Sequence, residues 1–165
     1  FNLNDPYLKM LIESGYNFDS SKIQFKKHPL YGSISTKEFT KCESNIFKNK
    51  NNFFEFEIPT QNFLGQNLPI SGGGYLRIFP LFFIKYLINQ FIKKNNCFFF
   101  YLHPFELSKK FEPQFLKKQK YIIKTRFNLG RQTSMSKLNY LINFLKKEKF
   151  EFVNFSSLMN EYINE

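Results

Sequence analysis

The chain has 165 residues, with 24 Lys and Arg against 13 Asp and Glu, two cysteines and no tryptophan. This length suits one domain with a hydrophobic core. Cys42 and Cys97 lie far apart and fit neither a disulfide framework nor a Cys-x-x-Cys metal site. The lysines are dispersed in pairs, and most of the 24 Phe fall in expected strands and helices. We therefore expect no nucleic-acid partner, because such a binder needs exposed aromatics among lysines on one face.

The first third of the chain predicts one helix and two strands. Asp5-Pro6 predicts a helix start with Asp5 as N-cap, and Gly15 predicts its end. A short strand is expected at residues 16–19, followed by an irregular surface stretch over residues 22–52. Residues 53–58 alternate aromatic and acidic side chains, which predicts a strand with one wet face, closed by Pro59.

The remaining two thirds predict helices alternating with strands. A glycine-rich turn is expected over residues 71–77, and Pro80 should start an apolar helix that reaches about Lys93. That segment is too short and too interrupted by polar residues to span a membrane. The other expected elements are strands at residues 97–102 and 150–153 and helices from Thr133 or Ser134 and over residues 156–163. This order favours a parallel α/β sheet or a barrel.

His103 is the first candidate for chemistry. It ends the apolar run of residues 97–102, which we interpret as a strand buried on both faces, and Pro104 prevents the ladder from continuing. The carboxyl end of such a strand is where barrels and open α/β sheets place reactive groups. The alternative is a strand-end histidine that hydrogen-bonds a backbone carbonyl and has no other role.

The other motifs do not complete an active site. The triple glycine at residues 72–74 lacks the features of a phosphate loop or a dinucleotide fingerprint. It allows a turn with positive φ and close approach of a ligand, or it is a flexible loop. His28 and His103 are isolated, so the chain holds no recognisable zinc ligand set, and no Gly-x-Ser-x-Gly elbow is present. Either the protein is not an enzyme, or the rest of its site lies elsewhere.

Five segments together resemble the C-terminal half of a polysaccharide deacetylase. The similarity is to the NodB-homology branch, carbohydrate esterase family 4, that is associated with exopolysaccharide and exosortase systems. The most specific pieces are Gly-Gly-Gly-Tyr-Leu-Arg at residues 72–77 and Leu-His-Pro-Phe-Glu at residues 102–106. The other segments are residues 11–21, 56–60 and 126–133.

The resemblance implies the C-terminal half of a distorted (β/α) barrel, with residues 1–165 as a single, incomplete domain. It implies hydrolysis of N-acetyl groups on a polysaccharide, with His103 as the acid that protonates the leaving amine. A divalent metal, usually zinc, would polarise the acetyl group. The family's metal ligands lie in a region upstream of the matching segments, so we expect this chain alone to bind no zinc and to be inactive.

The resemblance also suggests which residues line the sugar groove. These are Tyr75 and Arg77, with Gly73, Gly74, Asp19 and Glu106, although a purely structural role is open for each. Asp19, Glu57 or Glu106 would orient His103. A non-catalytic, carbohydrate-binding member of the same fold is the alternative function. A bacterial cytoplasmic and a cell-envelope location both stay open, as does the oligomeric state.

Overall fold

The structure is a computed structural model that describes residues 3–25, 34–108 and 113–164. The chain forms two compact units. Unit 1 comprises Phe1–Pro69, Asn89–Phe99 and Glu151–Glu165, and unit 2 comprises Ile70–Ile88 and Phe100–Phe150. The protein is of the mixed α/β class, as expected, and the described residues form small sheets and no closed barrel.

The main sheet of unit 1 has four short strands in the order β1-β4-β3-β2. They are β1 (Phe18–Asp19), β2 (Thr40–Glu43), β3 (Ile46–Lys48) and β4 (Phe54–Phe56). β1 and β4 are parallel, whereas β3 pairs antiparallel with both β4 and β2, so the sheet is mixed and not the parallel sheet that the order of elements favoured. The expectation of an irregular stretch over residues 22–52 is therefore wrong for the β2–β3 hairpin. A strand is recognised in a sequence by alternating apolar and polar residues. The lysines and the glutamate of this hairpin interrupt that alternation, so the segment carries no strand signal.

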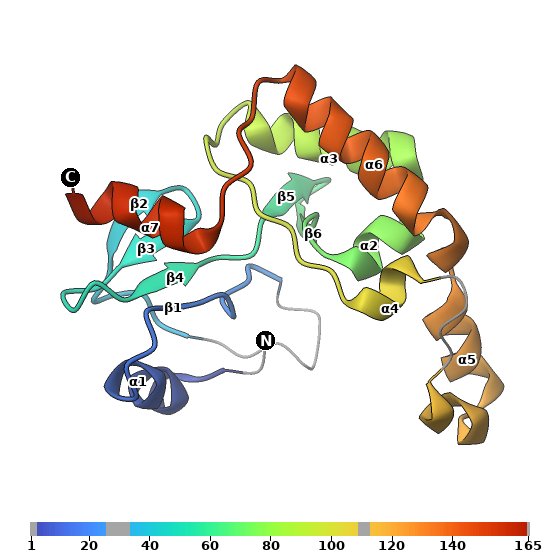
Figure 1. The fold of residues 1–165 in the computed structure, drawn as a ribbon, viewed down its shortest axis with the longest axis horizontal. Helices are drawn as coiled ribbons and strands as arrows, with labels where there is room; N and C mark the ends of the chain where they lie inside the picture. Colours follow the sequence, from blue (N-terminus) through green and yellow to red (C-terminus); the bar gives the residue numbers. More distant parts are fainter. Residues whose placement is uncertain (1–2, 26–33, 109–112, 165) are drawn as a thin grey trace. The chain divides into compact units, whose positions relative to one another are not determined.

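Helix α7 (Phe155–Asn164) covers the apolar face of this sheet (Figure 1). The ring of Phe56 lies 4.5 Å from that of Phe155 and edge-on, at 6.0 Å, to that of Phe99. Ile46, Phe54 and Met159 complete the buried cluster. The helix predicted at residues 156–163 is confirmed and extends one residue further at each end, because its apolar residues recur at helical spacing against this cluster.

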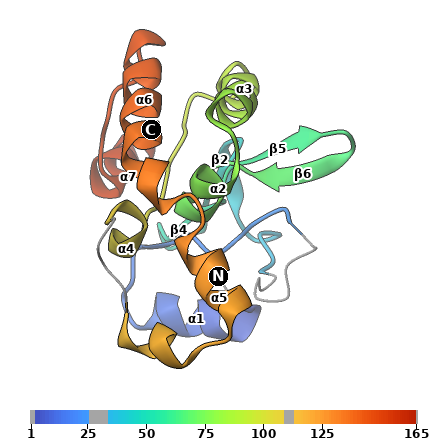
Figure 2. The ribbon, with the colours of Figure 1, turned by 90° about the vertical axis from the view of Figure 1, so that its right-hand side faces the viewer.

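A second, two-stranded sheet in unit 1 follows β4 and was not predicted. β5 (Thr60–Phe63) and β6 (Gln66–Pro69) form an antiparallel hairpin (Figure 2). Its turn residues Leu64 and Gly65 have φ values of 49° and 77°, as a type I′ turn requires. Leu-Gly is not one of the dipeptides that signal this turn, because a leucine rarely adopts a positive φ.

Unit 2 is mainly helical. Its long helix α6 (Arg131–Lys147) lies against α2 (Gly73–Ile78) and α4 (Pro104–Leu107) (Figure 1). η1 (Gln114–Lys118) and α5 (Tyr121–Asn128) precede α6. The sequence predicted no helix between Pro104 and Thr133, so η1 and α5 were missed, since neither shows a clear apolar stripe.

The predicted helices form, with two corrected starts. The N-cap of α1 (Asp5–Glu13) is Asn4, which accepts a hydrogen bond from the Tyr7 N–H, and not Asp5. The Asp5 carboxylate instead accepts from the N–H of Ser35 at 2.7 Å. α6 begins at Arg131, directly after Gly130, whose left-handed backbone follows the C-cap of α5 and turns the chain into α6. Gly15, with φ of 81°, follows α1 as predicted.

The long apolar helix is confirmed as α3 (Leu81–Ile92). Its buried side chains recur at helical spacing; they are Ile84, Leu87, Ile88 and Phe91. Across the part of the chain that the structure describes, no helix is long and apolar enough to cross a membrane.

Two of the predicted strands are wrong. Residues 97–102 are extended and half-buried, and their pairing is an isolated parallel bridge between Tyr101 and Gly72. Residues 150–153 form no strand, and Phe152 and Val153 are more than half exposed. An apolar run has the same sequence pattern whether or not neighbouring strands pair with it on both sides. The pattern alone therefore could not show that these two segments lack strand pairing.

Candidate functional site

His103 lies at the start of a helix and its ring is exposed. It is the N-cap of α4, with extended backbone, and Pro104 occupies the first helical position, which proline favours. The imidazole stacks on the Phe105 ring at 5.6 Å with an interplanar angle of 14°. Tyr101 presents its ring edge-on at 6.1 Å. Solvent therefore reaches the imidazole, while aromatic neighbours restrict its orientation.

Backbone hydrogen bonds join the glycine segment to the segment that carries His103. The Tyr101 N–H donates to the Ser71 carbonyl at 3.0 Å, and the Gly73 N–H donates to the Tyr101 carbonyl at 3.1 Å. These two bonds form the parallel bridge between Gly72 and Tyr101. The two motifs that are 30 residues apart in the sequence are thus held together within unit 2.

The glycines are needed for space and not for a positive φ. Gly72 caps α2 with extended backbone, and the glycines with positive φ among the described residues are Gly15, Gly65 and Gly130. A Cβ on Gly73 would lie 2.0 Å from Oε2 of Glu106. The expected positive-φ turn is therefore wrong, and the close approach at Gly73 is made by a carboxylate of the same chain.

Glu106 connects His103 to the glycine segment. Its side chain is almost fully buried, and Oε2 accepts a hydrogen bond from the His103 N–H at 2.9 Å. In return, the Glu106 N–H donates to the His103 carbonyl at 2.9 Å. Of the three carboxylates predicted to orient His103, that of Glu106 contacts it, at the His103 backbone N–H.

Arg77 is the charge partner of Glu106. Its Nε lies 3.3 Å from Oε1 of Glu106, and both side chains are at most 10% exposed. Its Nη1 donates to the Phe127 carbonyl at 2.7 Å. Removing one partner of such a buried pair costs about 3–5 kcal/mol, because the other charge stays buried. These contacts give Arg77 and Glu106 a structural role, and sugar binding by them stays a prediction.

Two further basic residues stabilise this region and were not predicted. Arg131 is buried, and its Nε donates to the Phe105 carbonyl at 3.0 Å. Lys137 Nζ donates to three carbonyls at the end of α2, at 2.8 to 3.1 Å, and burial lowers the pKa of Lys137. In a lysine-rich sequence, nothing distinguishes a buried cation from an exposed one.

The remaining candidates lie as follows. Tyr75 is half-buried on α2, with its ring 5.9 Å from that of Phe79, and Gly74 lies beside Gly73 in the same helix. Asp19 and Glu57 belong to unit 1. His28 lies outside the described residues. Contact of Tyr75, Gly74 or Asp19 with a sugar stays a prediction.

Unit 1 contains a buried carboxyl pair. Asp19 and Glu55 face each other across the parallel β1–β4 pair. Glu55 accepts hydrogen bonds from the N–H groups of Ser21 and Lys22, at 3.0 and 2.7 Å. Burial, and then the negative charge of Asp19, raise the pKa of Glu55 to about 8. The expected wet face of β4 is therefore wrong, since Glu55 and Glu57 are both buried.

This carboxyl pair predicts that the free energy of unfolding decreases as the pH rises from about 4.5 to about 8. Over that range the unfolded chain has released the Glu55 proton and the folded protein still holds it, so raising the pH favours the unfolded state. We expect a loss on the order of 3 kcal/mol. Glu55→Gln places an uncharged amide, which can still donate a hydrogen bond, at this position. The free energy of unfolding of this variant should therefore be nearly independent of pH over the same range.

Urea unfolding at about pH 5 and about pH 8.5 measures this effect. Glu13→Gln is the control, because Glu13 is exposed and forms a surface pair with Lys9, and it should keep the wild-type dependence on pH. A wild-type protein that is equally stable at both pH values would contradict the prediction.

The described residues do not fit a zinc site. Over residues 3–25, 34–108 and 113–164, no group of three or more His, Cys, Asp or Glu side chains could hold a metal ion. A structural or catalytic zinc needs at least three protein ligands. Any metal of the complete protein would need ligands from other residues.

These features define a mixed α/β domain in which an exposed histidine follows an extended segment bound to a glycine-rich helix start. Residues 20–160 match the model of a family described as "Domain of unknown function (DUF3473)". The match covers most of the chain, which therefore belongs to this family. No curated protein and no solved structure matches the chain.

Proposed function

We propose that the protein to which this chain belongs is a polysaccharide deacetylase in which His103 is the general acid. The observation that carries the proposal is the exposed imidazole at the start of α4, beside the glycine-rich start of α2. The segments around both positions are those that resemble the NodB-homology deacetylases most closely.

The reaction we propose is hydrolysis of the amide bond of an N-acetylated sugar. Water adds its oxygen to the acetyl carbon and loses a proton to a general base of the complete protein, and the carbon–nitrogen bond then breaks. The imidazolium of His103 gives its proton to the departing nitrogen, so that acetate and a free amino sugar are formed. Histidine suits this role because it is the side chain that ordinarily changes its charge between about pH 5 and 8.

We also propose that the chain forms part of a distorted (β/α) barrel completed by residues outside those described. Parallel neighbours support this, since a barrel of this type is built from parallel strands. They are the β1–β4 pair, the Ile23–Ile58 bridge and the Gly72–Tyr101 bridge. We propose that a divalent metal, zinc by resemblance, is bound by residues of that other part.

Acetate release tests the proposed function. The complete protein should release acetate from N-acetylated oligosaccharides, lose this activity with a chelator and regain it with zinc. We expect the 165-residue chain alone to release no acetate and to bind no zinc tightly, because its described residues contain no ligand set. Binding of the oligosaccharides without any acetate release would instead support the non-catalytic, carbohydrate-binding alternative.

A further inference from the structure

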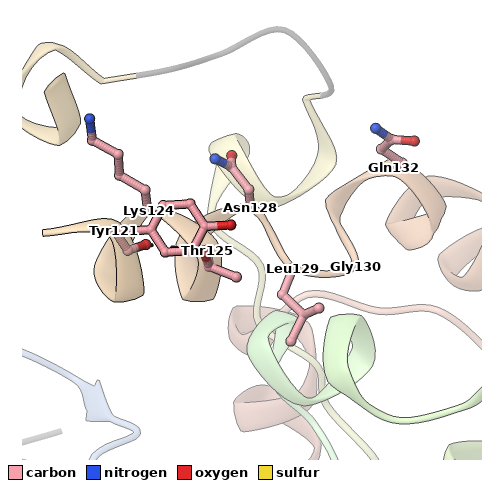
Figure 3. A pocket seen from close by; sticks show the side chains of 7 residues that line it. All are labelled: Tyr121, Lys124, Thr125, Asn128, Leu129, Gly130 and Gln132. Atoms are coloured by element: carbon pink, nitrogen blue, oxygen red, sulfur yellow. Dashed lines mark hydrogen bonds between the residues drawn. The ribbon is translucent and has the colours of Figure 1, made fainter. Parts of the chain in front are cut away.

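An open groove of about 550 Å³ lies where α5 meets α6 in unit 2 (Figure 3). α5 provides an aromatic ring, an ammonium group, a hydroxyl and an amide, and the start of α6 provides a second amide. The lining residues are Tyr121, Lys124, Thr125, Asn128, Leu129, Gly130 and Gln132. Neither the resemblance nor the proposed function assigns a role to this groove.

The spacing on α5 puts three of these residues on one face. Tyr121, Thr125 and Asn128 follow each other at i, i+4 and i+7, which places them in one row along a helix. The row is about 10 Å long, which is enough for more than one sugar ring. Arg131 Nη1 donates to Oδ1 of Asn128 at 2.8 Å, so this amide is held in place and keeps its NH₂ group as a donor.

Tyr121 is the largest apolar group of the groove and is 84% exposed. An aromatic ring that is this exposed offers a flat apolar face to a ligand. The carbon-bound hydrogens of a pyranose ring fit such a face, and its hydroxyl groups fit amide and hydroxyl partners. The combination of one ring with Thr125, Asn128 and Gln132 therefore suits a saccharide.

The charge around the groove points to an acidic ligand. Residues 113–147 contain no Asp or Glu but nine basic residues. Arg131 and Lys137 direct their donors to backbone carbonyls within unit 2, whereas Lys117, Lys118 and Lys120 are exposed. Lys124 lines the groove itself. A concentration of basic residues of this kind attracts anionic polymers.

We propose that this groove binds a segment of an acidic polysaccharide, with a sugar ring on Tyr121 and a sugar carboxylate at Lys124. The inference rests on the proposed function, because the bound segment would belong to the polymer whose acetyl groups are removed. A single-stranded nucleic acid is less suited, since it needs several aromatic rings for successive bases and the groove offers one.

Binding of a labelled oligouronate to the complete protein tests this proposal, with fluorescence anisotropy as the readout. Tyr121→Ala should weaken binding by about ten-fold or more, and Lys124→Gln should weaken it less and reduce its salt dependence. Tyr16→Ala and Lys94→Gln are the matched controls, because both residues are exposed and lie in unit 1. Both should bind like wild type.

The outcomes separate this inference from the proposed deacetylase activity, because binding is measured without turnover. Weaker oligouronate binding by Tyr121→Ala, with a neutral dextran oligosaccharide bound poorly by every variant, would support the groove even if no acetate were ever released. Equal affinity of wild type and Tyr121→Ala for the oligouronate would overturn it. The proposal would also be overturned if an oligothymidine or anionic vesicles bound more tightly than the oligouronate and Tyr121→Ala lost that binding.

Discussion

Replacing Gly73 by alanine should destabilise the protein by about 3 kcal/mol or more, because it overpacks a buried site that cannot expand. The new Cβ would lie 2.0 Å from Oε2 and 2.5 Å from Cδ of Glu106, and 2.8 Å from Cδ2 of Leu102. Glu106 cannot move away without losing the His103 N–H and Arg77. Urea unfolding of the purified variant measures the loss.

Gly74→Ala is the matched control, one residue further along the same helix. The nearest atom to a Cβ there is Oε1 of Glu106 at 4.0 Å, which is an ordinary contact. Alanine also favours a helix over glycine by up to about 1 kcal/mol, so this variant should be as stable as wild type or more so. Equal unfolding midpoints for the Gly73 and Gly74 variants would contradict the steric role of Gly73.

A double-mutant cycle identifies Glu106 as the group that Gly73 must accommodate. Glu106→Ala is destabilising by itself, since it leaves the guanidinium of Arg77 buried without its carboxylate. If the carboxylate is the obstacle, adding Gly73→Ala to Glu106→Ala should cost much less than adding it to wild type. Additive costs would assign the strain to Leu102 or to the helix backbone instead.

Replacing His103 by asparagine in the complete protein should reduce the turnover number for acetate release by about 10²- to 10⁴-fold, the contribution typical of a general acid. The free energy of unfolding should change little, because the ring is exposed and the contacts of Glu106 are with the His103 backbone. The metal content should also be unchanged, since the described residues around His103 form no metal site.

His28→Asn is the control for this experiment, because His28 is the other histidine of the chain and has no proposed role. It should release acetate at the wild-type rate. Loss of activity in both variants, together with a lower unfolding midpoint, would indicate a general effect on folding and not a chemical role of His103.

The sequence predicts those parts of the fold that depend on local pattern. The apolar spacing of α3 and α7 reflects a helix face that packs against a core, so both helices could be located within one or two residues. The end of α1 at Gly15 and the presence of strands around Asp19 and Glu55 were also predictable, although their pairing was not. The β2–β3 and β5–β6 hairpins were not, because polar strands and a Leu-Gly turn carry no clear signal.

The candidate site was predictable in its residues but not in its contacts. The glycine segment and the histidine segment could both be identified from sequence. The backbone hydrogen bonds that join the two segments could not. Arg77 and Glu106 are 29 residues apart, and only the tertiary fold pairs them. The family resemblance suggested ligand binding by both, whereas in the structure their side chains contact each other and backbone groups of unit 2.

Acetate release by the complete protein carrying His103→Gly, with and without added imidazole, tests the proposed role of His103 most directly. Imidazole can reach the vacated position, because the native ring is exposed. We predict a large loss of activity without imidazole and partial recovery with it, as expected when the missing group is a proton donor. Acetate release at the wild-type rate without imidazole would show that His103 is not the general acid.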